Sequence, residues 1–247
     1  MKRTTKAIAA IMLMFATMLA TGCTEKENNR GDANDTTDTL CDCVLATGDW
    51  VDLGLPSGLL WATRNVGASS PTDYGSYYAW GETSPKSVYR WDNYRYGGYY
   101  ELTKYCTDSA FGYNGFTDSL TTLQTGDDAA TANYGGHTPT YAEWQELINN
   151  TTNRWVTINN VNGHCFTGSN GNSIFLPAAG HRYDVTLHDD CNLRDDCTRG
   201  CYWSSSLYLA NPLGALICQF DSFPLIPGGI VANSRQQGLS VRAVRLP

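Results

Sequence analysis

The sequence lacks a hydrophobic run long enough to cross a membrane. The apolar stretch at residues 7–20 is shorter than the ~20 residues that a helix needs to span a bilayer. Positive charge is also scarce, with 17 Lys and Arg against 24 Asp and Glu and a formal net charge of -7. An acidic surface is a poor match for nucleic acid or for anionic lipid headgroups. We therefore expect no transmembrane helix and no nucleic-acid partner.

Long helical patterns are rare as well. The chain contains 24 Gly, and 12% of its residues are aromatic. This composition favours a loop-rich fold with many short strands. The part of the chain that follows the N-terminal segments is long enough for one domain with a hydrophobic core.

The N-terminus has the features of a bacterial secretory signal. The basic residues Lys2, Arg3 and Lys6 precede the apolar stretch, and small residues follow it. Residues 19–23 close the segment and resemble a bacterial lipobox. That resemblance implies cleavage before Cys23 and lipidation of Cys23. The alternative is an ordinary signal with a chance cysteine.

A polar segment follows the predicted lipidation site. Residues 24–40 contain one large apolar side chain, Leu40, so they bury too little surface to offset the entropy of ordering. We expect a signal peptide over residues 1–22, a lipidated disordered tether over residues 23–48, and a folded domain over residues 49–247.

Two acidic residues in the tether help to predict where in the cell the protein is located. Glu25 and Glu27 resemble the surface-export signal of some Gram-negative lipoproteins, and a plain solvated linker is the alternative. We expect a lipid anchor in the outer membrane, with the domain facing the cell exterior.

Cysteine usage fits an oxidising compartment. With Cys23 assigned to lipid, an even number remains, and secreted chains usually pair such cysteines. The connectivity cannot be read from the sequence, and the spacing of Cys41 and Cys43 is not that of a redox motif. The remaining cysteines are Cys41, Cys43, Cys106, Cys165, Cys191, Cys197, Cys201 and Cys218.

Two helices are expected in the first half of the domain. Thr140 and Glu143 have the spacing of a capping box, which predicts a helix over residues 141–149. Trp144 and Leu147 then share its apolar face. A weaker pattern predicts a helix over residues 127–134.

Short strands are expected on both sides of these helices. Asn162-Gly163 is a strong hairpin signal between two of them. Early helices with late antiparallel strands indicate an α+β domain. The predicted strands cover residues 51–53, 59–63, 155–158, 165–167, 174–176, 202–208, 215–220 and 240–245.

A series of motifs resembles one domain family. The motifs occupy residues 51–62 with 65–67, 78–82, 139–147, 176–180, 202–206 and 238–242. Their order resembles the Fibrobacter succinogenes major paralogous domain, over about residues 51–247, and is similar to the C-terminal domain of a collagen-like bacterial adhesin. Both resemble the C-type-lectin-like superfamily. The resemblance implies a compact, loop-rich C-type-lectin-like domain with two short helices and termini close together. It implies no defined ligand and no catalytic residues.

The chain also departs from related sequences. Calcium-dependent sugar lectins carry Glu-Pro-Asn and Trp-Asn-Asp triplets, and neither occurs here. The stretch at residues 181–200 looks longer than the usual link in the family. We expect no cofactor and no bound metal.

Two clusters contain side chains of the kinds used in catalysis or in metal binding. Ser204, Ser205 and Ser206 lack the glycine-flanked turn of a hydrolase nucleophile and fit alternating strand positions. His188, Cys191, Cys197 and Cys201 have no common zinc-finger spacing, and disulfides are preferred there.

Acidic residues crowd the same loop as these cysteines. Asp189, Asp190, Asp195 and Asp196 offer oxygens to Ca²⁺, although a solvated acidic loop is preferred. Paired carboxylates would also suit a glycosidase, but one sequence does not show their separations.

Two loops are the preferred ligand-binding candidates, because binding residues usually collect on loops. Rings give contact area and carboxylates give orientation. The alternative is that the rings pack in the core. The first loop, residues 89–100, offers Trp91, Tyr94, Tyr96, Tyr99 and Tyr100, and the second, residues 183–199, offers Asp189 and Asp190.

These observations favour a non-catalytic binding or adhesion module for a glycan or an extracellular protein. One alternative is an enzyme related to the formylglycine-generating fold, which needs paired active-site cysteines that we cannot match here. Another is a structural accessory of a surface filament or an uptake complex. The ligand and the oligomeric state stay open.

Overall fold

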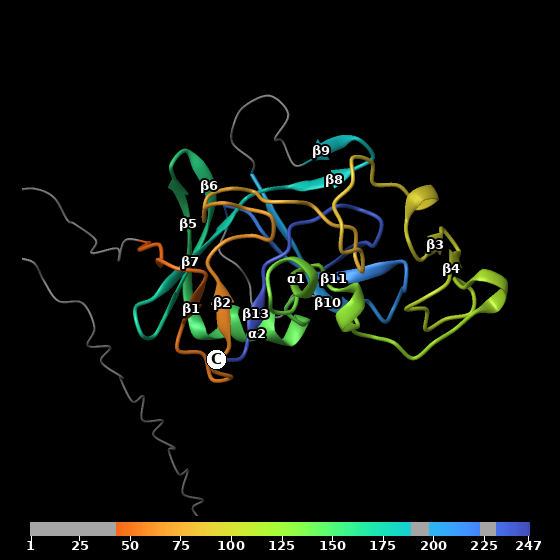
Figure 1. Cartoon of the computed structure of the whole chain (residues 1–247), viewed down its shortest axis with the longest axis horizontal. Coiled ribbons are helices and arrows are strands. Elements are labelled where there is room, and N and C mark those ends of the chain that lie inside the picture. The colour runs from red at the N-terminus through yellow and green to blue at the C-terminus, as the bar shows by residue number, and fades with distance from the viewer. Residues whose placement is uncertain (1–42, 189–197, 223–230) are drawn as a thin grey trace, which may run out of the picture. The chain divides into compact units, whose positions relative to one another are not determined.

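A computed structural model describes residues 43–188, 198–222 and 231–247 (Figure 1). The expected signal segment and the lipidation site Cys23 lie outside the described residues. So do Asp189 and Asp190, together with the other members of the acidic and cysteine-rich loop at 191–197.

The folded unit begins earlier than the expected boundary at residue 49. The described residues belong to one compact unit, Asp42–Pro247. A disulfide joins Cys43 to Cys165, and Leu45 forms a β-bridge with Ser173. These two contacts attach the last part of the expected tether to the sheet.

Within the described residues, two short α-helices and many short antiparallel strands form a loop-rich α+β fold, as expected. None of the helices in these ranges is long and apolar enough to cross a membrane. The helices are α1 (Ala129–Asn133) and α2 (Tyr141–Asn150), with 3-10 turns η1 (Trp91–Asn93), η2 (Tyr113–Gly115) and η3 (Thr125–Asp127). The strands are β1 (Trp50–Asp52), β2 (Leu60–Ala62), β3 (Gly97–Gly98), β4 (Glu101–Leu102), β5 (Thr151–Ile158), β6 (Val161–Gly168), β7 (Ser173–Pro177), β8 (His181–Tyr183), β9 (Thr186–His188), β10 (Gly200–Leu207), β11 (Gly214–Phe220), β12 (Ala232–Ser234) and β13 (Val244–Arg245).

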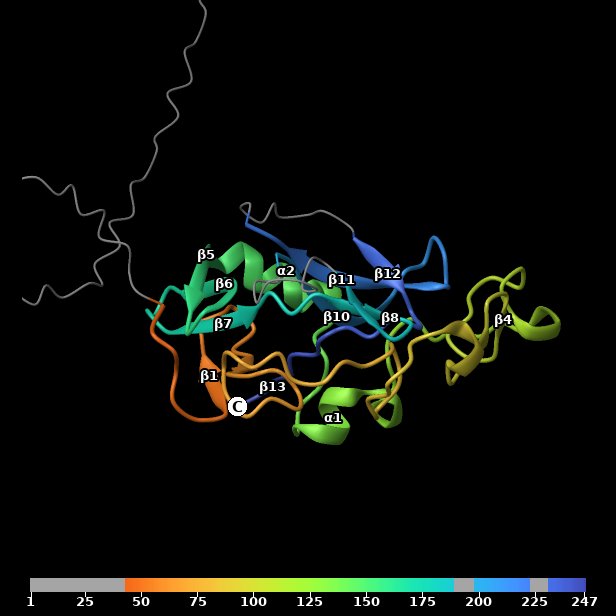
Figure 2. The ribbon, with the colours of Figure 1, turned by 90° about the horizontal axis from the view of Figure 1, so that it is seen from above.

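The strands pair into small sheets (Figure 2). The three-stranded sheets have the orders β1-β2-β13, β5-β6-β7 and β10-β11-β12, and β3-β4 and β8-β9 are two-stranded. The first and last strands of the domain therefore flank β2 in one sheet. The Arg245 guanidinium also lies 4.4 Å from the ring centroid of Trp50, so the two ends of the domain meet.

The helix α2 forms as expected, and its capping box is confirmed. The Thr140 hydroxyl accepts from the Glu143 backbone N–H at 3.2 Å, and the Glu143 carboxylate accepts from the Thr140 N–H at 2.6 Å. Trp144 and Leu147 are fully buried on its inner face. The helix α1 is shorter than the predicted 127–134, because the extended Asp128 caps it by accepting from the Ala130 N–H.

The predicted hairpin exists, but its turn is not at Asn162-Gly163. The chain reverses at Asn159 and Asn160, with φ values of 50° and 62°, and Asn tolerates this left-handed region. Gly163 instead lies inside β6, opposite Val156 and Pro177. A Cβ there would lie 2.3 Å from the Leu176 carbonyl oxygen and 2.6 Å from the Phe175 ring, so close packing accounts for this glycine.

Of the predicted C-terminal strand, residues 240–245, only β13 pairs with a neighbouring strand in a sheet. Upstream of β13 the extended chain changes partners from residue to residue. Ser240 donates its N–H to the Cys201 carbonyl, whereas the carbonyls of Val241 and Ala243 accept from Val66 and Ala62. The residues upstream of β13 therefore bond to strands of two different sheets, and they form no ladder with either sheet.

The core contains the tryptophans of the family-like motifs. Trp61, Trp80, Trp144 and Trp203 are at most 1% exposed. The Trp203 indole donates to the Tyr78 carbonyl at 2.7 Å, and the Trp80 indole donates to the Ser204 carbonyl at 2.8 Å. These motif residues hold the fold together and are inaccessible to a ligand.

One disulfide is present among the described cysteines, between Cys43 and Cys165. Cys106 and Cys218 depart from the usual pairing of cysteines in secreted chains, because both carry free, buried thiols. Both pack in the hydrophobic core. Burial raises the pKa of Cys218 to about 12 and also raises the pKa of Cys106.

Candidate functional site

The rings of the first candidate loop divide into a buried and an exposed group. Tyr94 and Tyr96 are 5% and 7% exposed, whereas Tyr99 and Tyr100 are 53% and 51% exposed. Trp91 is half-buried and makes edge contacts with Tyr94 and Tyr99. The expectation that Tyr94 and Tyr96 offer ring faces to a ligand is therefore wrong.

Tyr94 is buried because it helps to enclose a buried arginine. The Arg235 Nε donates to the Tyr94 hydroxyl at 3.0 Å, and that hydroxyl donates to the Trp80 carbonyl at 2.7 Å. The Arg235 guanidinium lies 5.0 Å from the Trp80 ring centroid and 5.3 Å from the Tyr94 ring centroid. Cation–π attraction is stronger at such a desolvated position.

Arg235 also fastens the chain that leads out to the exposed rings. Its Nη1 donates to the Tyr105 and Pro212 carbonyls at 3.0 and 2.9 Å, and its Nη2 donates to the Lys104 carbonyl at 3.1 Å. Sequence reasoning missed this residue, since its partners, the Tyr94 hydroxyl and backbone carbonyls, lie far away in the chain. Arg235 therefore holds the base of the loop while its outer part stays exposed.

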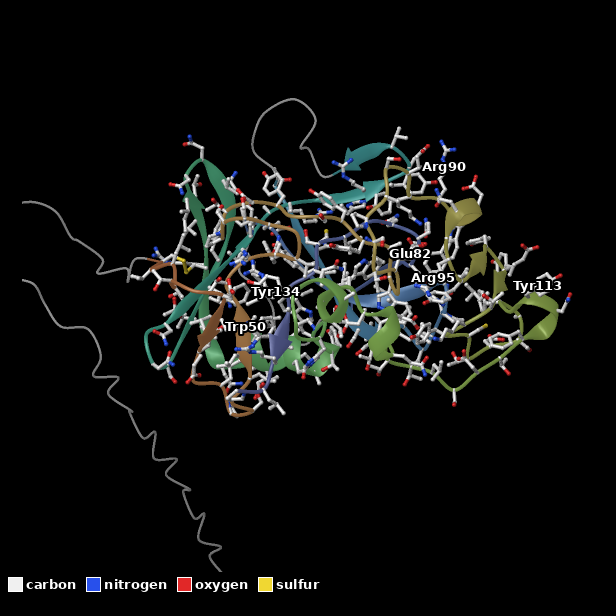
Figure 3. All side chains as sticks on the ribbon, in the orientation of Figure 1. Trp50, Glu82, Arg90, Arg95, Tyr113 and Tyr134 are labelled. Carbon is white, nitrogen blue, oxygen red and sulfur yellow. A yellow bond between two sulfur atoms is a disulfide. The ribbon has the colours of Figure 1, made fainter. Side chains whose placement is uncertain are left out.

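The exposed rings lie on a segment that we call the aromatic lobe, residues 97–118. It contains β3, β4 and η2 and lies at one end of the folded unit in both ribbon views (Figures 1 and 2). Tyr113 points outward at its far edge (Figure 3). The rings of the lobe with exposed or half-buried faces are Tyr99, Tyr100, Phe111, Tyr113 and Phe116.

The rings of the aromatic lobe are held in defined positions. Tyr100 stacks on Phe111 at 5.3 Å with an interplanar angle of 22°, and Tyr99 meets Tyr100 edge-on at 4.3 Å. Tyr100 adopts φ 62° and Asn114 adopts φ 51°, a region that is costly for a bulky residue. Phe111, Tyr113 and Phe116 were missed from the sequence, because they lie outside the predicted loop boundaries.

Two pockets adjoin the loop between β10 and β11. The smaller, which we call the asparagine pocket, has a volume of about 240 Å³. The larger, of about 460 Å³, lies between β10 and the start of α2. Tyr208 lines both. The asparagine pocket is lined by Tyr99, Tyr208, Asn211, Leu213, Gly214, Ala232, Asn233 and Ser234, and the larger pocket by Thr121, Thr122, Tyr141, Ser206, Leu207, Tyr208, Leu209, Ala210 and Leu216.

The serine cluster lies within β10. Ser204 and Ser205 are buried, and the Ser204 hydroxyl donates to the Leu216 carbonyl at 2.7 Å. The Ser206 hydroxyl accepts from the Tyr141 N–H at 3.1 Å. The Ser204 and Ser206 hydroxyls thus connect β10 to β11 and to the start of α2.

The zinc and calcium hypotheses both depend on residues that are not described, although His188 and Cys201 of the zinc set lie in β9 and β10. Asp189, Asp190, Cys191, Asp195, Asp196 and Cys197 all fall in the range 189–197. Among the residues that are described, no group of three or more His, Cys, Asp or Glu side chains is arranged to hold a metal ion.

The motifs that resemble the Fibrobacter succinogenes major paralogous domain supply core residues, as the buried tryptophans show. These core residues therefore stabilise the fold, and their burial keeps them from contacting a ligand. Comparison of the chain with protein-family models, with curated proteins and with solved structures found no match.

Proposed function

We propose that this chain is a lipid-anchored, cell-surface module that binds a glycan or an extracellular protein and catalyses no reaction. The observation that carries the proposal is the aromatic lobe. Tyr99, Tyr100 and Tyr113 are each more than half exposed there. Rigid aromatic side chains give large contact areas at low cost in conformational entropy, and they are enriched where proteins bind ligands.

The strain in the lobe supports a role in binding. Tyr100 occupies the left-handed region at φ 62°, although its bulky side chain disfavours that region. Such strain collects at ligand-contacting sites. In this proposal the stack on Phe111 helps to hold Tyr100 in its exposed orientation.

The location rests on the N-terminus. The basic start, the apolar residues 7–20 and the lipobox-like residues 19–23 support export and lipidation at Cys23. Glu25 and Glu27 support transfer to the outer face of the outer membrane. The resemblance to C-type-lectin-like domains supports a frame that carries binding loops.

The thiol chemistry favours binding over the formylglycine-type alternative. Reactive cysteines are accessible and have a lowered pKa. Cys106 and Cys218 are buried, and burial raises the pKa of both thiols. These two cysteines are therefore poor candidates for an active-site pair.

The test removes lobe rings without disturbing the base of the lobe. The variant Tyr100→Asn with Tyr113→Ser keeps a residue that tolerates φ 62° and deletes two exposed rings. Binding of the full chain to arrays of glycans and extracellular-matrix proteins should fall about tenfold or more while the melting temperature stays unchanged. Leu246→Ser is the control, since Leu246 is also an exposed apolar residue, at 69%.

Two outcomes would count against the proposal. One is a wild-type chain that binds nothing on either array. The other is a lobe variant that binds as well as the wild type. Capture of a filament or uptake-complex subunit in place of these ligands would favour the structural-accessory alternative.

A further inference from the structure

We infer that the asparagine pocket binds one neutral sugar ring of a glycan. This inference rests on the proposed function and names the class of ligand. The pocket lies where β11 pairs with β12, because Gly214 lies opposite Ser234 and Ala215 lies opposite Asn233. That pairing brings Asn233 and Ser234 beside the loop that carries Asn211.

Among the described residues that line it, the pocket has no charged side chain that would hold a charged ligand at neutral pH. Its lining residues in the described chain include no Asp, Glu, Lys, Arg or His. A buried phosphate, sulfate, carboxylate or ammonium group would lack a partner of opposite charge and would lose its hydration. An uncharged ligand therefore fits the pocket best.

Both asparagines leave an amide N–H₂ group to donate to a ligand. The Asn211 Oδ1 accepts from the Leu213 N–H at 3.0 Å, and the Asn233 Oδ1 accepts from the Ser234 N–H at 2.8 Å. Because a backbone N–H can only donate, the side-chain atom that accepts from it must be the amide oxygen. The other side-chain atom of each asparagine, Nδ2, then carries the N–H₂ donor. Neither Nδ2 has a hydrogen-bond acceptor among the described residues.

A hydroxyl adds to these donors. The Ser234 Oγ also has no hydrogen-bond partner in the described ranges. The pocket thus presents two amide donors together with the Ser234 hydroxyl. Sugar hydroxyls supply acceptor oxygens for the amides and a donor or acceptor for Ser234.

The aromatic walls and the size of the pocket suit a single ring. Tyr99 is 53% exposed and Tyr208 is half-buried, so both offer apolar surface to the C–H groups of a pyranose. The volume of about 240 Å³ is below the ~300–1,000 Å³ typical of sites for drug-sized ligands. One sugar residue would be enclosed, and the rest of the glycan would extend from Tyr99 along the aromatic lobe.

The test exchanges one amide group for one oxygen. In Asn211→Asp and Asn233→Asp, the carboxylate keeps the oxygen that accepts from the backbone and loses the N–H₂ donor. The probes are methyl glycosides of neutral hexoses and of N-acetylglucosamine, with glucuronic acid and sialic acid as charged comparisons, measured on the full chain by saturation-transfer NMR. Each variant should bind the neutral probe about tenfold more weakly or worse, with an unchanged melting temperature.

The controls separate the site from the charge change and from unfolding. Asn160→Asp makes the same exchange in the exposed β5–β6 turn, where Asp tolerates the φ of 62°, and should bind as the wild type does. Ser234→Ala removes a pocket hydroxyl without removing a described hydrogen bond, so it tests the site even if an Asp variant unfolds.

The inference fails if the wild type binds only charged sugars, or if Asn211→Asp, Asn233→Asp and Ser234→Ala all bind as the wild type does. If these variants keep binding and the Tyr100→Asn/Tyr113→Ser variant loses it, the sugar pocket is wrong and the proposed function stands. If the wild type binds no saccharide and no extracellular protein, both are wrong.

Discussion

Individual aromatic residues have opposite roles in this chain according to their partners. Tyr94 and Tyr100 belong to the same ring-rich stretch, yet Tyr94 is 5% exposed and Tyr100 is 51% exposed. Tyr94 is buried because its hydroxyl accepts a hydrogen bond from the fully buried guanidinium of Arg235. A buried charged group left without its partners is costly, so Tyr94 is required by the core.

His137 and Glu143 give a pH-dependent contact at the start of α2. The His137 Nε2 lies 3.1 Å from the Glu143 Oε1. The hydrogen bond that His137 donates to the Glu143 carboxylate raises the pKa of His137 above its ordinary 6.5. Burial alone would raise the pKa of Glu143, but bonds from His137 and Thr140 outweigh it and hold that pKa below the ordinary 4.5.

The contact is expected to stabilise the fold most between about pH 4.5 and 6.5. The His137 contribution is complete below pH 6.5 and is lost as the pH rises through its raised pKa. The Glu143 contribution is complete above pH 4.5 and is lost as the pH falls through its lowered pKa. Because the His137 side chain is 41% exposed, the effect should be only about 0.5 kcal/mol.

The measurement compares the wild type with His137→Gln in urea unfolding across this pH range. The difference in the free energy of unfolding should peak near pH 5.5 and shrink toward pH 9. A difference that grows with pH would contradict the assignment.

At the scale of elements, the sheet β5-β6-β7 is joined covalently to the start of the domain. The Cys43–Cys165 disulfide spans 122 residues in sequence and attaches to β6. A cross-link over so long a loop removes much of the freedom of the unfolded chain.

Removal of this disulfide should lower the free energy of unfolding by about 3–5 kcal/mol. The variant is Cys43→Ser with Cys165→Ser, measured by chemical denaturation, and a reducing agent should destabilise the wild type more than the variant. Cys106→Ser is the control, since its buried thiol forms no disulfide and its loss should not change the response to reductant. A wild type that is insensitive to reductant would show that the cross-link does not form.

At the scale of the whole molecule, the proposed attachment to the membrane depends on the N-terminal segment. Cys23 is the expected site of lipidation, and the helices in the described ranges cannot span a bilayer. Cys23→Ala should therefore move the protein from the detergent-requiring membrane fraction to the soluble fraction.

Cys41→Ala is the matched control, because it makes the same exchange outside the lipobox-like residues 19–23 and should leave the protein membrane-bound. Cell fractionation with detection of the protein in each fraction is the measurement. If the Cys23→Ala protein stays in the membrane fraction, the lipid anchor is wrong.

Much of the fold was predictable because its signals are local. The capping box of Thr140 and Glu143 marked the start of α2, since both residues bond within one turn. Apolar spacing along that helix predicted the burial of Trp144. Runs of strand-forming residues located most of the strands, although the hairpin turn was misplaced because Gly163 serves packing and not chain reversal.

The sequence by itself determined the acidic balance, the loop-rich α+β class and the burial of Trp144, because these depend on composition and on neighbours along the chain. Only the tertiary structure decided which rings are exposed, which cysteines pair and where a pocket forms. Arg235 reaches Tyr94 from far along the chain, and Cys43 reaches Cys165. Asn211 and Asn233 line one pocket only because β11 pairs with β12. Such contacts depend on how distant segments are packed, and no local pattern records them.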